Sequence, residues 1–175
     1  MKRKWLLGVL ATPVALILVL TLVGWTLPVE HTASGSTVIG RSPPEVFAVI
    51  ADFGAGATWR RSVESIELLE ERDGRAAWIE HGAFGPIPLE LVESTPPVRF
   101  VTRIADDSLP FAGTWTFELR EVDGGSAITI TEHGSVRPPV HRFLSRFVFG
   151  HHRALEEYLS DLGRSFGEDV RVTRS

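Results

Sequence analysis

PPVHRFLSRFVFGHHRALEEYLSDLGRSF, residues 138–166, is the stretch from which the rest of the sequence is best interpreted. Its apolar residues recur at steps of three and four, which is the period of a helix with one buried face. These residues are Val140, Leu144, Phe147, Leu155, Tyr158, Leu162 and Phe166. Pro138 and Pro139 suit the first turn of this helix. Unbroken, it would be about 45 Å long, and Gly150 is a position where it could bend. A helix of this length needs a broad apolar surface to pack on.

The middle of the chain supplies strands that can build this surface. Six short segments have the spacing of β-hairpins. They are residues 63–70, 75–81, 87–93, 98–105, 114–122 and 126–136. Asp123-Gly124-Gly125 is a tight-turn sequence between the last two. The last three segments alternate apolar and polar residues, so we expect an antiparallel sheet with one wet face and one face covered by the C-terminal helix.

The segment before these hairpins predicts a strand followed by short helices. Residues 32–39 form the expected first strand. Ser42-Pro43-Pro44-Glu45 is a helix start, because serine accepts from a free amide, proline fits the first turn and glutamate completes a capping box. Glycines end this helix near residue 54, and residues 58–61 can form another helical turn.

The N-terminus predicts a membrane anchor. No charged residue occurs from Trp5 to Leu27, a length of 23 residues that reaches about 34 Å as a helix, enough to cross a bilayer core. Lys2, Arg3 and Lys4 precede it, so the positive-inside rule leaves the tail in the cytoplasm and the rest outside. The alternative is a cleaved signal peptide. The long apolar run and the lack of a small-x-small cleavage site at the usual place argue against it.

Composition excludes several classes of function. The chain has 175 residues and no cysteine, so disulfides, thiolate metal sites and a cysteine nucleophile are excluded. Beyond the basic tail, 15 arginines stand against 22 acidic residues. A domain with this balance is a poor binder of polyanions, so we expect no nucleic-acid partner.

The order of these elements resembles the helix-grip fold of the START-like (SRPBCC) superfamily, which includes polyketide cyclases, plant pathogenesis-related allergens and lipid-transfer domains. Three stretches carry the resemblance: STVIGRSPPEVFAVIADFGAGATWRRSVESIELL (36–69), GTWTFELREVDGGSAITITEHGSV (113–136) and HRFLSRFVFGHHRALEEYLSDLGRSF (141–166). The resemblance implies an α+β fold in which a curved antiparallel sheet wraps around a long C-terminal helix. It also implies a cavity between sheet and helix, usually for an apolar ligand.

The resemblance covers residues 32–167, which we take as the domain. Residues 1–31 are then the cytoplasmic basic tail, the transmembrane helix and a short linker, and residues 168–175 are a C-terminal tail. The superfamily has no universal catalytic residues, so the resemblance does not bring an activity with it. We expect no cofactor and no bound metal.

Large aromatic rings and a few polar residues are the candidates for ligand binding. The complete set is Trp59, Trp78, Phe84, Phe100, Phe111, Trp115, Glu132, Phe147 and His151. Ordinary core packing is the alternative for the rings, and it is favoured for Phe100 because that residue lies in mid-strand. Trp59, Phe84 and Phe111 lie near loops, where the mouth of a pocket is as good an interpretation.

Three polar residues are weak candidates for catalysis. Glu132 continues the apolar phase of its strand, so its carboxylate should point to the covered face, where acid–base work or recognition of a hydroxyl is possible. The alternative is that Glu132 is solvated or paired with an arginine. Glu80 is its possible companion. His151 falls on the apolar stripe of the long helix, where a hydrogen-bonded core residue is the alternative. His152 and Glu156 have a spacing compatible with a metal but lack a third ligand.

Two function classes follow. The first is a membrane-tethered module that holds a hydrophobic small molecule or lipid between sheet and helix, with the bilayer and this ligand as its partners. The second is a polyketide cyclase- or dehydratase-like enzyme that acts in the same cavity through Glu132, with His151 or Glu80.

Overall fold

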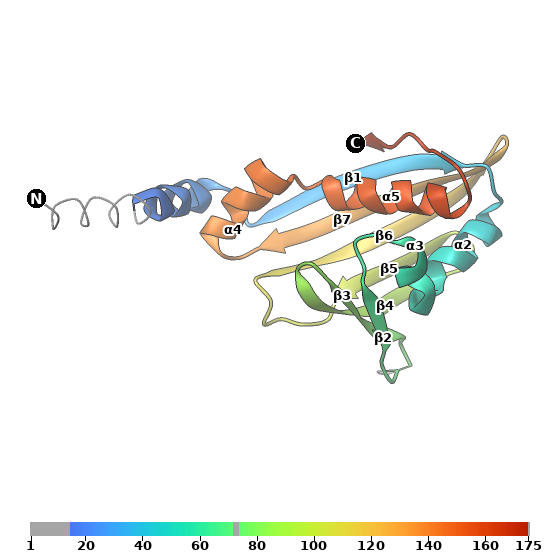
Figure 1. The fold of residues 1–175 in the computed structure, drawn as a ribbon, viewed down its shortest axis with the longest axis horizontal. Helices are drawn as coiled ribbons and strands as arrows, with labels where there is room; N and C mark the ends of the chain where they lie inside the picture. Colours follow the sequence, from blue (N-terminus) through green and yellow to red (C-terminus); the bar gives the residue numbers. More distant parts are fainter. Residues whose placement is uncertain (1–14, 72–73, 175) are drawn as a thin grey trace, which may run out of the picture.

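The computed structural model describes residues 15–71 and 74–174, and in this part of the chain eight strands form one antiparallel sheet (Figure 1). The strand order across the sheet is β2-β3-β4-β5-β6-β7-β1-β8. The strands are β1 (Glu30–Ile39), β2 (Ser65–Leu68), β3 (Ala77–Gly82), β4 (Gly85–Thr95), β5 (Arg99–Ile104), β6 (Phe111–Val122), β7 (Gly125–Val136) and β8 (Thr173–Arg174). The prediction of a curved antiparallel sheet built from hairpins is confirmed.

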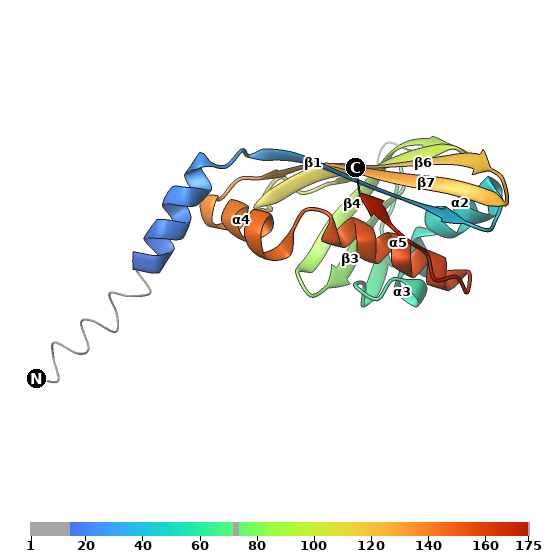
Figure 2. The same ribbon diagram turned by 90° about the horizontal axis from the view of Figure 1, so that it is seen from above.

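Helical segments cover one face of this sheet (Figure 2). They are α2 (Pro43–Ala51), the 3-10 turn η1 (Phe53–Ala55), α3 (Gly56–Trp59), α4 (Pro139–Leu144), the π-helical turn η2 (Ser145–Phe149) and α5 (Arg153–Ser165). A further helix, residues 15–26, extends away from the domain beside α4.

The short helix α2 begins where the sequence predicts. The backbone N–H of Ser42 donates to the carboxylate of Glu45 at 2.9 Å, as expected of a capping box, and Pro43 and Pro44 occupy the first turn. Val46 and Ile50 are buried against the sheet. The helix is therefore held by a local start signal and by one apolar face.

The C-terminal segment is not the single long helix that its apolar period predicts. A π-helical turn follows α4, with the backbone N–H of Gly150 donating to the carbonyl of Ser145 at 3.0 Å. Gly150 then adopts a φ of 74°, a left-handed conformation that glycine tolerates at little cost and that no helix continues through. The chain restarts as α5 at Arg153. The apolar period was right for α5, whose stripe is buried, but it was wrong for Phe147, which is exposed, and it does not report this break.

The helix α5 is the part of the segment that packs on the sheet. Leu155, Leu159 and Leu162 are fully buried, together with the sheet residues Ile128 and Ile130. A buried carboxylate also belongs to this helix. Asp161 is 2% exposed and accepts hydrogen bonds at 2.9 Å from both the backbone N–H and the side-chain Nε of Arg61. This links α5 to the loop that follows α3.

The last residues are more than a tail. β8 pairs with β1 through Gly35 and Ser36. Before it, the hydroxyl of Thr37 donates to the carbonyl of Arg171 at 2.9 Å, and the amide of Gly40 donates to the Glu168 carboxylate at 3.0 Å. The segment after α5 therefore runs along the edge of β1, which the sequence did not indicate.

The predicted membrane span lies partly outside the described residues, because residues 5–14 of it fall there. Its remaining part forms the helix 15–26 and joins the domain at α4, where the Arg142 guanidinium donates to the carbonyl of Leu27 at 2.9 Å. In the part of the chain that the structure describes, no helix combines the length and the apolar character needed to cross a bilayer.

We expect the Asp161→Ala variant to lower the free energy of unfolding by about 2 kcal/mol, because it leaves a backbone donor of Arg61 without its buried acceptor. Urea unfolding followed by tryptophan fluorescence measures this. Glu157→Ala is the control on the same helix, since its ion pair with Arg153 is exposed and should be worth no more than about 0.5 kcal/mol. Equal losses in both variants would show that the Asp161 contact has no special role.

Candidate ligand cavity

A cavity of about 500 Å³ lies between the sheet and the C-terminal segment. Strands β3 to β7, the loop after α3 and both parts of the C-terminal segment contribute to its wall. Its aromatic lining consists of Phe53, Trp59, Trp78, Phe84, Phe100, Phe111, Trp115, Phe117, Phe149 and Tyr158. A volume of this size accommodates a small organic ligand, and a wall rich in aromatic rings favours an apolar one.

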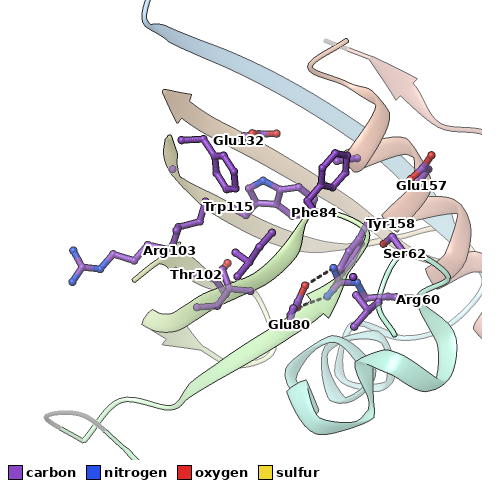
Figure 3. Close-up of a pocket in the computed structure, with 18 of the residues that line it drawn as sticks. Arg60, Ser62, Glu80, Phe84, Thr102, Arg103, Trp115, Glu132, Glu157 and Tyr158 are labelled. Atoms are coloured by element: carbon purple, nitrogen blue, oxygen red, sulfur yellow. Dashed lines mark hydrogen bonds and ion pairs between the residues drawn. The ribbon is translucent and has the colours of Figure 1, made fainter. Parts of the chain in front are cut away.

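A salt bridge lies in the wall between α3 and β3 (Figure 3). Arg60 donates to both oxygens of Glu80, at 2.5 and 2.9 Å, and its guanidinium carbon lies 5.0 Å from the ring centre of Tyr158. The indole of Trp78 also donates to Glu80, at 3.3 Å. The pair is thus bidentate and packed between aromatic rings, which is the geometry that best compensates two buried charges.

The environment fixes the charge state of this salt bridge. Burial alone would lower the pKa of Arg60, but the charge of Glu80 and its hydrogen bonds outweigh burial and raise that pKa. Burial raises the pKa of Tyr158 far above its usual value, although Arg60 opposes the effect. Arg60 and Glu80 therefore stay paired and Tyr158 stays neutral, so the deep wall is polar without net charge.

A second polar cluster, which we call the histidine–glutamate cluster, consists of His31, Glu132 and His151. The rings of His31 and His151 stack with centres 3.9 Å apart, and His31 Nε2 lies 3.4 Å from Glu132 Oε1. His151 Nδ1 lies 3.1 Å from the Ser145 hydroxyl. All three members of the cluster line the cavity. It joins the start of β1, the late part of β7 and the segment after Gly150.

A glycine makes room for this cluster. Gly134 is the direct partner of His31 in the pairing of β1 with β7. A Cβ atom placed on Gly134 would collide with the His31 imidazole, so any other residue here would displace that ring. The glycine therefore allows His31 to lie across β7 and reach Glu132.

Burial lowers the pKa of His151 below its ordinary value of 6.5, and the neighbouring His31 lowers it further. The charge of Glu132 opposes these effects, whereas Arg146 and His152 add to them. His151 is therefore a neutral imidazole at neutral pH.

The mouth of the cavity is bordered by exposed aromatic rings. Phe84, in the turn between β3 and β4, is 79% exposed, and its ring lies 6.3 Å from that of Phe149 in η2 in an edge-on arrangement. Phe147 and Val148 are also exposed in η2. These two residues and the helix 15–26 belong to the same end of the domain, next to α4.

The structure brings together eight of the nine ligand-binding candidates. Trp59, Trp78, Phe84, Phe100, Phe111, Trp115, Glu132 and His151 all line the cavity. Phe147 does not line it. It is 60% exposed, because the π-helical turn shifts the phase of the helix and carries its ring outward to contact Phe143. Phe100 is both a cavity wall and a core residue.

The polar candidates have different surroundings from those expected. Glu132 is partly buried and has no arginine partner among the described residues; its Oε1 lies 3.4 Å from His31 Nε2. Glu80 is not its companion but the partner of Arg60. Glu156, considered with His152 as a metal pair, binds Arg174 instead. Within residues 15–71 and 74–174, no group of three potential ligand side chains has the geometry for a metal ion.

Sequence reasoning missed His31, Arg60 and Tyr158 as members of the site. His31 lies 120 residues from His151 in the sequence, and no local pattern connects them. A weak signal existed for Arg60, since it follows a tryptophan at the end of a helical turn. Tyr158 was recognised only as part of the apolar stripe.

We expect acid to destabilise the domain partly through His151. Its pKa is lowered in the folded chain, so between that pKa and 6.5 the unfolded chain binds more protons, and stability falls as pH falls through this window. The His151→Gln variant should therefore lose less melting temperature than the wild type between about pH 7 and 5. His133→Gln, on the outer face of β7, is the matched control and should follow the wild type. A His151→Gln profile parallel to that of the wild type would contradict the expectation.

Comparison with known proteins supports this architecture. Residues 30–164 match the family described as "Polyketide cyclase / dehydrase and lipid transport". The Zhui aromatase/cyclase from Streptomyces sp. R1128 is 15% identical, with a TM-score of 0.62 over 78% of this chain and 94% of that one. A START superfamily protein from Mycobacterium smegmatis is 12% identical, with a TM-score of 0.60 over 77% of this chain and 96% of that one. At these identities the likeness shows a shared fold.

A curated relative matches over a shorter stretch. The D-aminopeptidase of Cereibacter sphaeroides is 33% identical over 107 residues, which are 59% of this chain. The match spans only 20% of the length of that enzyme. The likeness therefore says nothing about peptidase activity here.

Proposed function

The chain belongs to the polyketide cyclase/dehydrase and lipid transport family, and from this membership we propose that it binds a hydrophobic small molecule or lipid in the cavity between sheet and α5. The observation that carries the proposal is the cavity itself, about 500 Å³ of space walled largely by aromatic rings. A hydrophobic interior normally packs to the density of a crystal, so an opening of this size is costly unless it is filled. A bound apolar guest restores the lost contacts.

Membrane attachment is the second part of the proposal. The helix 15–26 exposes Leu16, Leu18, Val19, Leu22 and Trp25 to solvent. Together with the apolar run that precedes it and the basic residues at the N-terminus, this supports a single-pass anchor with a cytoplasmic N-terminus and an extracytoplasmic domain. The cavity would then exchange ligands with the nearby bilayer, where apolar molecules accumulate, through the mouth bordered by Phe84 and Phe149.

We expect Thr102→Trp to abolish binding of the neutral fluorescent probe N-phenyl-1-naphthylamine. Thr102 lines the cavity on β5, so a tryptophan there occupies ligand volume. Thr116→Trp on β6 is the matched control, because Thr116 alternates with the cavity-lining Trp115 and Phe117 and should leave binding within about twofold of the wild type. Probe titration and melting curves of all three proteins separate lost binding from lost folding. Unchanged binding in Thr102→Trp would exclude the cavity as the site.

We expect the full chain to remain with membranes after alkaline carbonate extraction, and Val19→Arg to release it into the supernatant. A charge in mid-span costs about 2.5–3.5 kcal/mol on insertion scales. Val38→Arg is the matched control, since both valines are 55% exposed but Val38 lies in β1 of the domain. Release of the wild type by carbonate would refute the anchor without affecting the cavity proposal.

A cyclase- or dehydratase-like enzyme is the second candidate. It is favoured by the presence in the cavity wall of Glu132 and a neutral His151, which both contact His31, because such titratable groups are suited to proton transfer. Under this alternative, Glu132→Gln would change the compound that mass spectrometry finds with the purified protein. Under the binding proposal the same compound would be found.

A further inference from the structure

The histidine–glutamate cluster provides more than a hydrophobic guest requires. An apolar cavity gains nothing from three titratable side chains brought together from β1, β7 and the segment after Gly150. The cluster nevertheless has a built geometry, with stacked imidazoles at 3.9 Å, the His31–Glu132 contact at 3.4 Å, and Gly134 as the residue that makes room. Because the arrangement depends on three separate parts of the fold, we expect it to bind a specific polar group of the ligand.

The hydrogen bonds of the cluster leave two atoms available. His31 lies beside Glu132 Oε1, and Ser145 engages His151 Nδ1. Among the described residues, no hydrogen bond is found to Glu132 Oε2 or to His151 Nε2. Glu132 therefore offers an acceptor. His151 Nε2 is a donor or an acceptor according to the ring tautomer, which the rotatable Ser145 hydroxyl can accommodate either way.

This pair of atoms matches a hydroxyl group. A hydroxyl has one hydrogen to donate to the Glu132 carboxylate and lone pairs to accept from the His151 imidazole. A hydrocarbon would desolvate both groups and satisfy neither, which costs more than a missing bond in water.

The charges of the cavity exclude a ligand carboxylate. Such a group would lie against Glu132 in apolar surroundings, where like charges repel strongly. The charges of both arginines that line the cavity are already paired with carboxylates, Arg60 with Glu80 and Arg103 with Glu90, although among the described residues the buried Arg60 Nε has no hydrogen-bond partner. Figure 3 shows Arg103 pointing away from the labelled cavity residues.

We propose that the histidine–glutamate cluster is a subsite that holds the hydroxyl group of an uncharged, otherwise apolar ligand. The inference rests on the proposed binding function and adds the chemical class of the ligand to it: an alcohol or a phenol rather than a hydrocarbon or a carboxylic acid. His31 positions the Glu132 carboxylate, and Glu132 and His151 contact the hydroxyl.

Three fluorescent probes that share one ring system test this: 9-anthracenemethanol, 9-methylanthracene and 9-anthracenecarboxylate. Titrations of the full chain in detergent at neutral pH give three dissociation constants. We expect the alcohol to bind about tenfold more tightly than the methyl compound, as one hydrogen bond to a charged acceptor allows, and the carboxylate to bind most weakly. Glu132→Gln removes the charge without removing the volume, so it should improve binding of the carboxylate and reduce the preference for the alcohol.

Glu118→Gln is the matched control, because Glu118 lies on β6 outside the cavity and pairs with Arg99. It should leave the three constants in the wild-type order and ratio. Equal affinity for the alcohol and the methyl compound in the wild type would overturn the subsite and uphold the apolar cavity. Equal effects of both substitutions would overturn the subsite as well. Binding of none of the three probes would overturn the proposed function and the subsite with it. The wild-type ratios decide the matter if Glu132→Gln does not fold.

Discussion

The packing of α5 on the sheet is the contact on which the cavity depends. Leu155, Leu159 and Leu162 are buried on one side of this helix, and Asp161 fastens it to the loop after α3 through Arg61. These contacts hold the helix along β1, at one side of the sheet. The face of the sheet formed by β3, β4 and β5 is not covered by this helix, and its aromatic side chains line the cavity instead. The helix α5 therefore completes the core on one side of the sheet and leaves the cavity open on the other side.

The two polar clusters of the cavity differ in how many hydrogen bonds their own members make with one another. Arg60 donates through its two Nη nitrogens to both carboxylate oxygens of Glu80, so the pair is close to neutral, although among the described residues the buried Arg60 Nε has no hydrogen-bond partner. The histidine–glutamate cluster has one histidine–carboxylate contact at 3.4 Å and one hydrogen bond, with hydrogen-bonding capacity remaining. The first cluster mainly holds α3 against β3, and the second offers an unused carboxylate oxygen and an unused imidazole nitrogen to a guest.

Local patterns in the sequence predicted the fold better than the site. The strands, the capped start of α2 and the apolar stripe of α5 follow from periodicity and turn residues, which report on neighbours within a few positions. The break at Gly150 was recognised only as a possible bend, because a glycine inside a helical pattern does not reveal whether its φ is positive. The π-helical turn just before this glycine was not predicted either, and it carries Phe147 to the surface.

Such local patterns could not predict which side chains pair with one another in the site. Phase placed Glu132 on the covered face, where it lines the cavity, but it was ambiguous for Glu80, and it could not say that one meets His31 and the other Arg60. Each of these pairs joins residues far apart in the sequence, and it forms only once the sheet has been assembled. An expectation based on single residues therefore found most of the cavity wall and misjudged the surroundings of its charges.

The segment that follows α5 has a consequence for how copies of this domain can meet. A sheet with an open border invites strands of other molecules to extend it, which is a common route to aggregation. Here residues 168–174 lie along much of the border formed by β1, and the opposite border is β2, only four residues long. Neither side offers a long template, so copies of this domain at high local concentration would gain little by sharing strands.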